Sequence, residues 1–268
     1  MSKLEIYCVT NKAIKSLEDY NYNLCAVGKG NFSNNYIKCD HGENIFNKEE
    51  FYSELTFHYW FWRNQLDLKS ENWIGFCQKR RFWIKLDSKK DIINNSNFKD
   101  HLLNEPHKDW KNYESLICEE INVNDMNKMK IIKRGIKNII SDPSILFNKN
   151  KQTIKIHFDM HHSHGNLDKA IDLFENEEKE KFRKFVNDST SFNPHIMFIA
   201  KPKVVNEWFK NLFNWLFKCE KIFKFEDLKG YDTKRLYAYL AERYLSFWFK
   251  KYTNSIDWPL ITVDIENI

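Results

Sequence analysis

A short apolar stretch, residues 73–77 (WIGFC), is followed directly by the polar and basic residues Gln78, Lys79, Arg80 and Arg81. The stretch has the length and composition of a buried parallel strand. Ligands of open α/β sheets bind outside the carboxyl ends of such strands, and the fixed fork of arginine suits a pyrophosphate better than lysine does. The cluster therefore predicts a site for a nucleoside diphosphate. A strand that leaves the core, with its arginines paired to carboxylates, is the structural alternative.

Two earlier strand ends add polar groups of the same kind. Residues 4–9 are expected to form the first strand and residues 24–27 a second. The residues that follow these strands are Thr10, Asn11, Lys12 and Gly28. A hydroxyl, an amide and an amine there suit a base or a ribose, and an ordinary solvated turn fits equally well. The glycine spacing is not that of a P-loop, and no Lys-Ser/Thr pair follows.

The second candidate is rich in histidine. Residues 153–158 (TIKIHF) alternate like a strand, so His157, Asp159 and His161 are expected to share one face, where a divalent metal would fit. His162 adjoins them. Asp159 or a histidine is alternatively a general base or a substrate-binding group, and a polar loop without function is the third interpretation.

A third candidate lies before an expected buried strand at residues 196–200. Asn193 and His195 stand at its start, separated by one proline. At the rim of a sheet, an amide and an imidazole can form hydrogen bonds with sugar hydroxyls. A simple turn before the strand accounts for the same residues.

Composition narrows the class of protein. The chain has 268 residues, 42% of them hydrophobic and 16% aromatic, which is enough for a substantial core. Its net charge of +5 is mild, and its lysines are dispersed among acidic residues, so nucleic acid is not the expected partner. The six cysteines form no CxxC pair and are expected to be buried free thiols. Without a signal peptide or a long apolar run, a cytoplasmic protein is expected.

Short strands alternating with helices predict an α/β fold: one Rossmann-like domain over residues 1–268, with a mixed, mainly parallel sheet flanked by helices. A helix is expected from Asn47 to Leu66, opened by a capping box of Asn47 and Glu50. The other expected elements are a strand at 113–120, a lysine-rich solvated helix and loop at 122–150, helices at 204–217 and 233–252, the last capped by Asp232, and a surface insertion at 86–111.

Several blocks together carry a resemblance. They are Glu54–Asn64 (ELTFHYWFWRN), Trp73–Trp83 (WIGFCQKRRFW), His195–Ile199 (HIMFI), Trp215–Phe217 (WLF) and Tyr239–Arg243 (YLAER). In this order they resemble a bacterial glycosyltransferase-like family, long labelled a domain of unknown function, that is found in capsular and exopolysaccharide loci. The chain departs from the family pattern at Gln78 and Lys79, where relatives carry His-Tyr; a catalytic role of that histidine would pass to another residue here.

The resemblance implies a GT-A-like transferase that uses a nucleoside-diphosphate sugar. Many GT-A enzymes hold a divalent metal with Asp-x-Asp at the strand end that carries Gln78–Arg81 here, so we expect basic side chains to neutralise the leaving diphosphate. Mn²⁺ or Mg²⁺ stays open as a cofactor, with His157, Asp159 and His161 as the fallback ligands. The expected roles are nucleotide and pyrophosphate binding by Thr10, Asn11, Lys12, Gly28, Arg80 and Arg81, sugar or acceptor binding by Gln78, His162 and Asn193, and catalysis by Asp159, His161 or His195.

The expected function is transfer of a sugar, UDP-linked, to a growing capsular or surface polysaccharide, without nucleic acid. Peripheral association with membrane-bound capsule machinery, at the inner face of the membrane, is left open. Two rival functions remain. One is a metal-dependent hydrolase built on His157, Asp159 and His161. The other is a non-catalytic nucleotide- or glycan-binding assembly protein.

Overall fold

The computed structural model describes residues 2–124 and 128–264, and its chain divides into two compact units. The sheet unit comprises Met1–Glu119, His195–Asn211 and Trp248–Ile268. The helical unit comprises Glu120–Pro194 and Leu212–Phe247. Two long helices, α9 (Pro202–Cys219) and α11 (Leu236–Tyr252), contribute residues to both units. Each unit is described by itself below.

A nine-stranded sheet forms the sheet unit within the described residues. Its main path runs in the order β10-β6-β9-β4-β1-β2-β3, and every strand on this path except β9 points the same way. β5 and β11 extend it antiparallel from the end of β4. The predicted α/β class with a mixed, mainly parallel sheet is confirmed. The strands are β1 Leu4–Thr10, β2 Asn23–Ala26, β3 Ile37–Lys38, β4 Trp73–Gln78, β5 Arg81–Trp83, β6 Ser115–Cys118, β9 Phe198–Ala200, β10 Ser255–Trp258 and β11 Leu260–Thr262.

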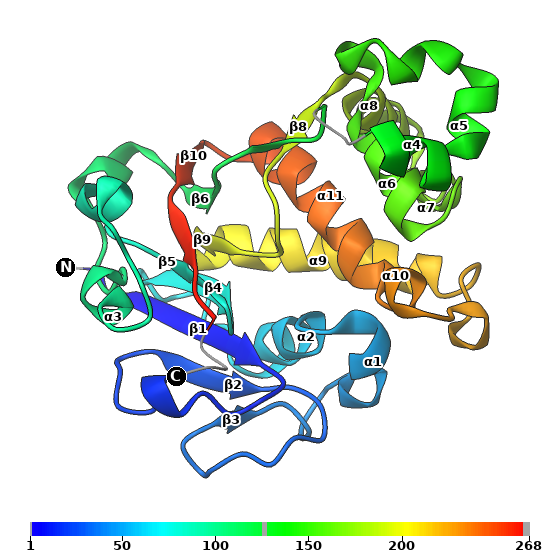
Figure 1. The fold of residues 1–268 in the computed structure, drawn as a ribbon. Helices are drawn as coiled ribbons and strands as arrows, with labels where there is room; N and C mark the ends of the chain where they lie inside the picture. Colours follow the sequence, from blue (N-terminus) through cyan, green and yellow to red (C-terminus); the bar gives the residue numbers. More distant parts are fainter. Residues whose placement is uncertain (1, 125–127, 265–268) are drawn as a thin grey trace. The chain divides into compact units, whose positions relative to one another are not determined.

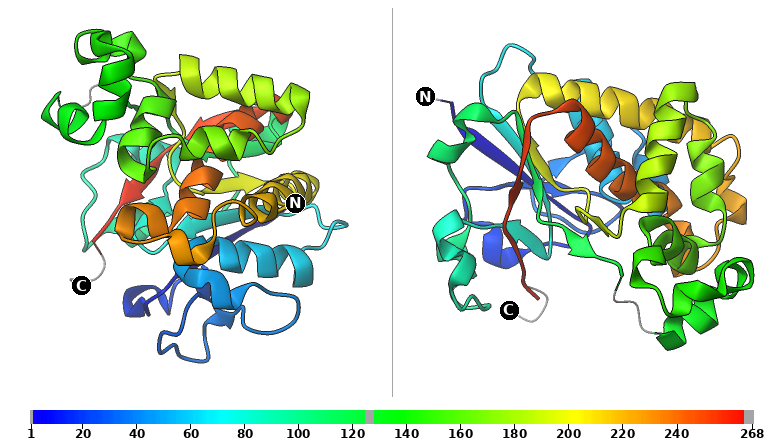
Figure 2. Two further views of the ribbon diagram at one scale, coloured as in Figure 1. Left: turned by 90° about the vertical axis from the view of Figure 1, so that its right-hand side faces the viewer. Right: turned by 90° about the horizontal axis from the view of Figure 1, so that it is seen from above.

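Strands near the chain's end complete the sheet. β10 lies beside β6 from the middle of the chain, and β11 pairs with β5, so segments far apart in sequence are neighbours (Figures 1 and 2). The helices of the sheet unit are α1 Glu49–Tyr52, α2 Leu55–Asn64 and α3 Phe98–His101, with the ends of α9 and α11. Because a strand's side chains alternate between its faces, each face of the sheet needs its own cover.

Aromatic side chains cover one face of the sheet. Phe76 of β4 lies between the rings of α2 and α9, with centroid distances of 5.3 Å to Phe61 and 5.7 Å to Phe209. Phe198 of β9 contacts Phe249 of α11 at 5.1 Å. The helical spacing of aromatic residues in these helices is therefore a core face, as expected for residues that recur at steps of three and four.

The segment expected to be a surface insertion, residues 86–111, covers the opposite face. Its Phe98, Leu102 and Trp110 are buried in one cluster with Trp73 of β4 and with Met197, the residue before β9. Short 3-10 turns at Leu86–Lys90 and Lys108–Asn112 bracket α3. Most residues of this segment are polar or charged, so the sequence pattern did not show that its few large apolar residues are buried.

The helix expected from Asn47 to Leu66 is broken. A 3-10 turn at Phe46–Lys48 leads into α1, and Ser53 then adopts a positive φ of 53°, so that α2 begins anew at Leu55. The capping box of Asn47 and Glu50 was wrong, because no side-chain cap bond forms there and the amide of Phe46 is bound by the Asn44 side chain instead.

In the helical unit, the secondary structure predicted for residues 153–158 was wrong. Residues 153–158, expected to be a strand, lie in the helix α6 (Ile154–His162). Ile154 and Phe158 are fully buried at a spacing of four, whereas Ile156 is only partly buried. Six residues of apparent alternation are too few to separate a period of two from a helical period. The other elements here are β7 Ile121–Asn122, β8 Ser191–Phe192, α4 Lys128–Arg134, α5 Ile136–Ser141, α7 Asn166–Ile171, α8 Asn176–Asp188 and α10 Tyr231–Lys234.

Two smaller predictions have clear outcomes. All six cysteines are free and buried, as expected of thiols that serve as small core residues. The last long helix is not capped by Asp232, because α10 begins after Gly230, and α11 starts separately at Leu236.

Candidate functional site

Three neighbouring parallel strands, β4, β1 and β2, end at one edge of the sheet unit. The predicted nucleotide-binding residues follow these ends, so the topology brings them to one edge. β9 runs antiparallel to β4, with Phe198 paired to Phe76, so the start of β9 lies at the same edge. The candidates that the topology places at this edge are Thr10, Asn11, Lys12, Gly28, Gln78, Arg80, Arg81 and His195.

The basic cluster forms the turn of a hairpin. Gln78, the last residue of β4, pairs with Arg81, the first residue of β5, and Lys79 and Arg80 form the two-residue turn between them. The chain thus reverses at the sheet edge instead of leaving the core. A reversal of this kind holds four consecutive polar side chains at the carboxyl end of β4, where ligands of open α/β sheets bind.

A polar relay orients Arg81. Its guanidinium donates to Oε1 of Gln78 at 3.1 Å, and the Gln78 amide nitrogen donates to the carboxylate of Glu54. Glu54 stands at the break before α2, which Ser53 produces with its positive φ. The relay fixes the direction of the guanidinium without neutralising it directly, since an amide separates the two charges.

Arg80 is held more loosely. Its Nε lies 3.9 Å from Oδ1 of Asp264, and these side chains are 44% and 57% exposed. A pair of this exposure contributes little to stability and exchanges readily with other anions. The backbone carbonyl of Arg80 accepts a hydrogen bond from Val263 at 2.9 Å, so the turn is fixed by its backbone.

The loops after β4 and β1 are tied together. Nζ of Lys79 donates to Oδ1 of Asn11 at 2.9 Å. Oγ1 of Thr10 accepts the amide of Lys12 at 3.1 Å and also donates to its carbonyl, which makes a compact turn at the end of β1. The first loop is therefore structured, and its Thr10 is used within the turn.

Gly28 shows why a glycine follows β2. Its φ is +73°, a region that L-residues rarely adopt. A Cβ there would also lie 3.1 Å from Oε2 of Glu49. The backbone can thus pass close to the side chain of Glu49 at this edge.

His195 has a strained backbone. Its φ of 68° is positive, and its side chain is partly buried just before β9. Non-glycine residues in this region are uncommon and cluster where surrounding structure imposes them, often at functional sites. His195 therefore remains a candidate at the sheet edge.

The helical unit separates the predicted metal ligands. On α6, His157 and His161 are four residues apart, and their rings lie 4.7 Å from centroid to centroid. Asp159 projects in another direction, because it lies two residues along a helix. Within residues 2–124 and 128–264, no group of three His, Cys, Asp or Glu side chains is arranged to hold a metal. The shared strand face expected for His157, Asp159 and His161 does not exist.

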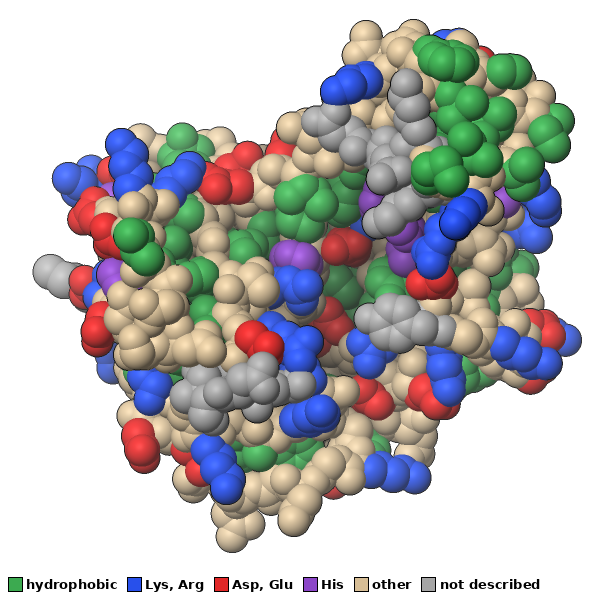
Figure 3. Space-filling view, viewed as in Figure 1, with side chains coloured by type: hydrophobic (Ala, Val, Ile, Leu, Met, Phe, Trp, Pro, Cys, Tyr) green, Lys and Arg blue, Asp and Glu red, His purple; other side chains and the backbone are tan. Residues whose placement is uncertain are grey.

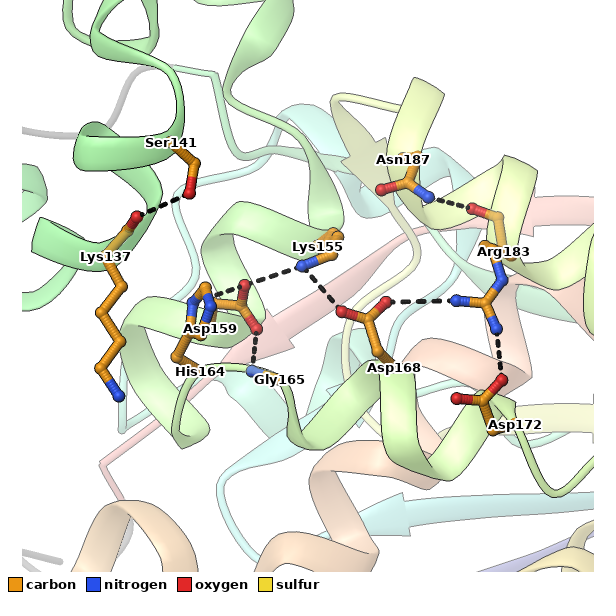
Figure 4. Close-up of polar contacts among 10 residues, drawn as sticks. All are labelled: Lys137, Ser141, Lys155, Asp159, His164, Gly165, Asp168, Asp172, Arg183 and Asn187. Carbon is orange, nitrogen blue, oxygen red and sulfur yellow. Dashed lines mark hydrogen bonds and ion pairs between the residues drawn. The ribbon is translucent and has the colours of Figure 1, made fainter.

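The carboxylate of Asp159 is engaged in the fold. It is buried, with Nζ of Lys155 3.0 Å and Nδ1 of His164 3.3 Å from Oδ2, and Oδ1 accepts the amide of Gly165 at 3.0 Å. Lys155 also contacts Asp168 at 3.0 Å. Arg183 continues the network from Asp168 to Asp172, so that α6, α7 and α8 are joined (Figure 4). These contacts occupy the oxygens that a general base would need.

Burial keeps two histidines of α6 uncharged. Burial, aided by the charge of Arg243, lowers the pKa of His157 to about 2, and an Arg243 nitrogen donates to its Nδ1 at 3.2 Å. Burial lowers the pKa of His162 to about 3 in the same way. The His162 ring stacks on Tyr239 at 3.7 Å, and its Nδ1 donates to the carbonyl of Asp232 at 2.9 Å. Both rings therefore serve as neutral parts of the helix packing.

Asn193 does not stand at a rim. It is fully buried. Its side-chain Oδ1 accepts a hydrogen bond from the hydroxyl of Ser246 at 2.7 Å, and its backbone N–H donates to the same hydroxyl at 3.1 Å. Arg243 pairs with Glu242, and Arg63 pairs with Glu43 at 2.9 Å. Glu54 belongs to the Gln78 relay instead.

A cavity of about 460 Å³ opens beside the end of α6. His161 lines it and accepts from Arg134 at 3.4 Å, and Arg134 also contacts Asp232 at 3.3 Å. His164 and Lys137 line the same cavity. Of the predicted site residues, Asp159 and His161 line this cavity.

Most of the chain matches a known protein family. The family described as a domain of unknown function, DUF4422, matches residues 5–254. The chain belongs to the DUF4422 family. A solved structure, the bifunctional glycosyltransferase WbbM in its apo form, is similar to 98% of this chain, with a TM-score of 0.70 and 18% identity. This chain spans 46% of that protein's length. A comparison with curated proteins gives no match.

At 18% identity, the likeness to WbbM shows the fold. The blocks on which the sequence resemblance rested have clear places in this DUF4422 chain. Residues 54–64 form the start and body of α2, and residues 73–83 form β4, the basic turn and β5. Both blocks meet in the bond between Glu54 and Gln78.

Two residues of this sheet edge were given no individual role from the sequence. Lys79 was counted only as part of the basic cluster, and Glu54 was named only as the first residue of the block ELTFHYWFWRN. The signal for Lys79 was its place in the same four-residue run. For Glu54 no local signal existed, because its partner is 24 residues away on another element.

Proposed function

We propose that this DUF4422 protein transfers a sugar from a nucleoside-diphosphate donor, UDP-linked, to an oligosaccharide or polysaccharide acceptor of a capsule or other surface glycan. The observation that carries the proposal is the meeting of three parallel strand ends at one edge, with a basic hairpin turn beside the first two loops. The fold shared with WbbM supports the same class of reaction.

The donor's nucleotide lies, in this proposal, along the ends of β1 and β2. Asn11 and Lys12 carry an amide and an amine, and the turn of Thr10 shapes the loop. Gly28 is proposed to face the nucleotide through its backbone, beside the side chain of Glu49, which lies where a Cβ would stand. Arg81, already oriented by Gln78, donates to the diphosphate. Oriented donors are effective because they need not reorganise as negative charge develops on the leaving group.

Charge neutralisation follows from the residues of the turn. Lys79, Arg80 and Arg81 supply three cations at the place where many GT-A enzymes carry metal-binding carboxylates. Arg80, whose side chain is 44% exposed, is proposed to contact a phosphate oxygen through its guanidinium. We therefore propose that side chains neutralise the leaving diphosphate, with Mn²⁺ or Mg²⁺ as the alternative that EDTA tests.

His195 is the candidate base for activating the acceptor hydroxyl, because β9 brings it to the edge that carries the basic turn. Its strained backbone is consistent with a position imposed by function. In the helical unit, His161 and its cavity are proposed to bind sugar or acceptor groups. Asp159, His162 and Asn193 are engaged in packing contacts, and we assign them to the fold.

The first experiment is a thermal-shift screen against UDP, GDP, CMP and dTDP sugars, because a ligand that binds only the folded state raises the melting temperature. The best donor is then incubated with glycan acceptors, and the released nucleotide and the product are measured. Arg81→Ala should lower kcat/KM about a hundredfold or more. Arg63→Ala, which breaks an exposed pair with Glu43, is the matched control and should keep wild-type turnover.

The outcomes separate the rival functions. Wild-type turnover in both Arg80→Ala and Arg81→Ala would refute the assignment of the turn. Binding of UDP without transfer or donor hydrolysis, across a broad acceptor panel, would favour a non-catalytic assembly protein. Activity that disappears with EDTA and returns with Mn²⁺ would show that a metal neutralises the diphosphate.

A further inference from the structure

One face of the helical unit exposes large apolar side chains. Met129 and Ile132 of α4 and Ile136 and Ile140 of α5 are 59%, 44%, 55% and 76% exposed, and Phe147 shortly after α5 is 80% exposed. We call these five residues the α4–α5 face. In Figure 3 a group of green side chains covers the part of the surface where Figure 1 labels α4 and α5.

The arrangement differs from that of a solvated helix. Ile131 of α4 is already buried in a small core with Ile145 and Met160, and Ile139 of α5 packs against it. The inner side of α4 and α5 thus has its apolar partners, and the outer side is apolar as well. Helices on a protein surface normally turn a polar face to water. The solvated lysine-rich face expected at residues 122–150 is therefore apolar along α4 and α5.

Positive charge surrounds these residues. The segment 128–151 has seven Lys and Arg and one Asp, a net charge of +6, whereas the whole chain has +5. Lys133 and Lys137 are exposed, and no ion pair is recorded for either side chain within the described part of the chain. Apolar side chains and unneutralised lysines thus share one short pair of helices.

The composition points to lipid rather than to protein as the partner. Protein interfaces are enriched in Trp, Tyr, Phe, Met and Arg and depleted in Lys, whereas residues 128–151 contain six Lys, no Trp or Tyr, and one each of Phe, Met and Arg. Helices that lie in a membrane interface combine an apolar face with Lys and Arg that reach the anionic headgroups. In the described residues, no helix has the length and hydropathy to cross a bilayer, so attachment through this face would be superficial.

We propose that the α4–α5 face docks on the surface of an anionic phospholipid bilayer. Met129, Ile132, Ile136, Ile140 and Phe147 enter the boundary between headgroups and acyl chains. Lys133 and Lys137 contact lipid phosphates. Ile136 and Lys137 also line the cavity proposed above for sugar or acceptor groups. Docking on lipid nevertheless concerns the helical unit alone, and vesicle binding is measured without the transfer reaction.

Co-sedimentation with vesicles tests this docking. The full chain is mixed with vesicles of phosphatidylcholine alone, or of phosphatidylcholine and phosphatidylglycerol at about 2:1. We expect binding to the anionic vesicles, little binding to the neutral ones, and weaker binding as salt screens the attraction. Ile136→Asn/Ile140→Asn should lower the affinity at least about tenfold through lost apolar insertion. Lys133→Glu/Lys137→Glu should lower it at least about twentyfold.

Matched variants control for general effects of charge and hydrophobicity. Ile92→Asn changes an isoleucine that is 88% exposed in the sheet unit. Lys169→Glu/Lys210→Glu reverses two exposed lysines on other helices. Both should bind anionic vesicles as the wild type does. Ile136, Ile140, Lys133 and Lys137 are all exposed, so both variants of these residues should melt near the temperature of the wild type.

Three results would overturn the proposal. The first is wild-type protein that does not bind anionic vesicles. The second is a loss of vesicle affinity in the control variants equal to that in the variants of the face. The third is a dimer, measured by light scattering without lipid, that Ile136→Asn/Ile140→Asn dissociates while vesicle binding is unchanged. In that case a second copy of the chain covers the face.

Discussion

His58 offers a quantitative test of how the helix α2 is packed beneath the candidate edge. The side chain is 1% exposed, and its ring lies 4.5 Å from Phe76 and 5.5 Å from Phe209. Its Nδ1 has no hydrogen-bond partner among the described residues. Burial lowers the pKa of His58 to about 3, because a charged imidazole is poorly solvated among phenylalanine rings.

The sign of the effect on stability follows from linkage. The folded protein keeps His58 neutral down to about pH 3, whereas the unfolded chain protonates it near its ordinary pKa of 6.5. Stability due to the neutral ring is therefore complete above pH 6.5 and is lost as the pH falls toward 3. Each pH unit in this window costs about 1.4 kcal/mol, so lowering the pH from about 7.5 to about 5.0 costs about 2 kcal/mol through this residue.

The perturbation is His58→Leu, which removes the titrating group and keeps an apolar side chain. The free energy of unfolding is measured with urea at about pH 7.5 and about pH 5.0 for the variant and the wild type. We expect the variant to lose about 2 kcal/mol less than the wild type between these pH values. Any constant effect of the substitution cancels, because only the difference between the two pH values is compared.

The exposed histidine His41, changed to leucine, is the control. Its side chain is 65% exposed, and its removal should leave the pH dependence of unfolding as in the wild type. Equal losses of stability in His58→Leu and wild type would refute the reasoning, because they would show that the ring takes up a proton within the folded protein.

Three further predictions follow from single contacts. Glu54→Ala removes the acceptor that orients the Gln78 amide, so the KM for the donor should rise several-fold in steady-state assays with little change in melting temperature; an unchanged KM would separate Glu54 from donor binding. Gly28→Ala should lower the free energy of unfolding by about 1 kcal/mol in urea, because φ is +73° there, and wild-type stability would mean that the loop relaxes. Asp159→Asn weakens the buried pair with Lys155 and should cost about 3 kcal/mol by the same measurement, while activity of the folded fraction persists; loss of turnover in fully folded Asp159→Asn would instead restore Asp159 as a catalytic group.

Local pattern was sufficient for most of the sheet. The predicted strands at residues 4–9, 24–27 and 73–77 match β1, β2 and β4 within two residues at each end. Each is a short apolar run that a buried parallel strand requires on both faces. The strands β3, β5, β10 and β11 were missed, because each is only two to four residues long, and β10 and β11 pair with segments far away in the sequence.

The candidate site divides in the same way. The sequence alone showed that Arg80 and Arg81 follow a buried strand and that the glycine after the second strand, Gly28, does not belong to a P-loop. The sequence did not show that the two arginines lie in a hairpin or that Arg81 contacts Gln78. The strand β5 that completes this hairpin also pairs with β11, near the other end of the chain. Burial likewise decided against Asn193, whose partner Ser246 is 53 residues away.

By itself the sequence determined the buried strands β1, β2 and β4, the apolar face of the helix α9, and which polar residues follow those three strands. Residue type and periodicity act over a few neighbours, so these features need no knowledge of the whole fold. Only the tertiary structure decided the strand order that gathers Thr10, Gly28, Gln78 and His195 at one edge. It also decided that residues 154–162 form a helix, which brings the rings of His157 and His161 together and turns Asp159 away from them. Strand pairing and burial are interactions between segments that are distant in the sequence. A six-residue pattern such as TIKIHF fits both the period of a strand and that of a helix, and contacts with the rest of the fold decide between them.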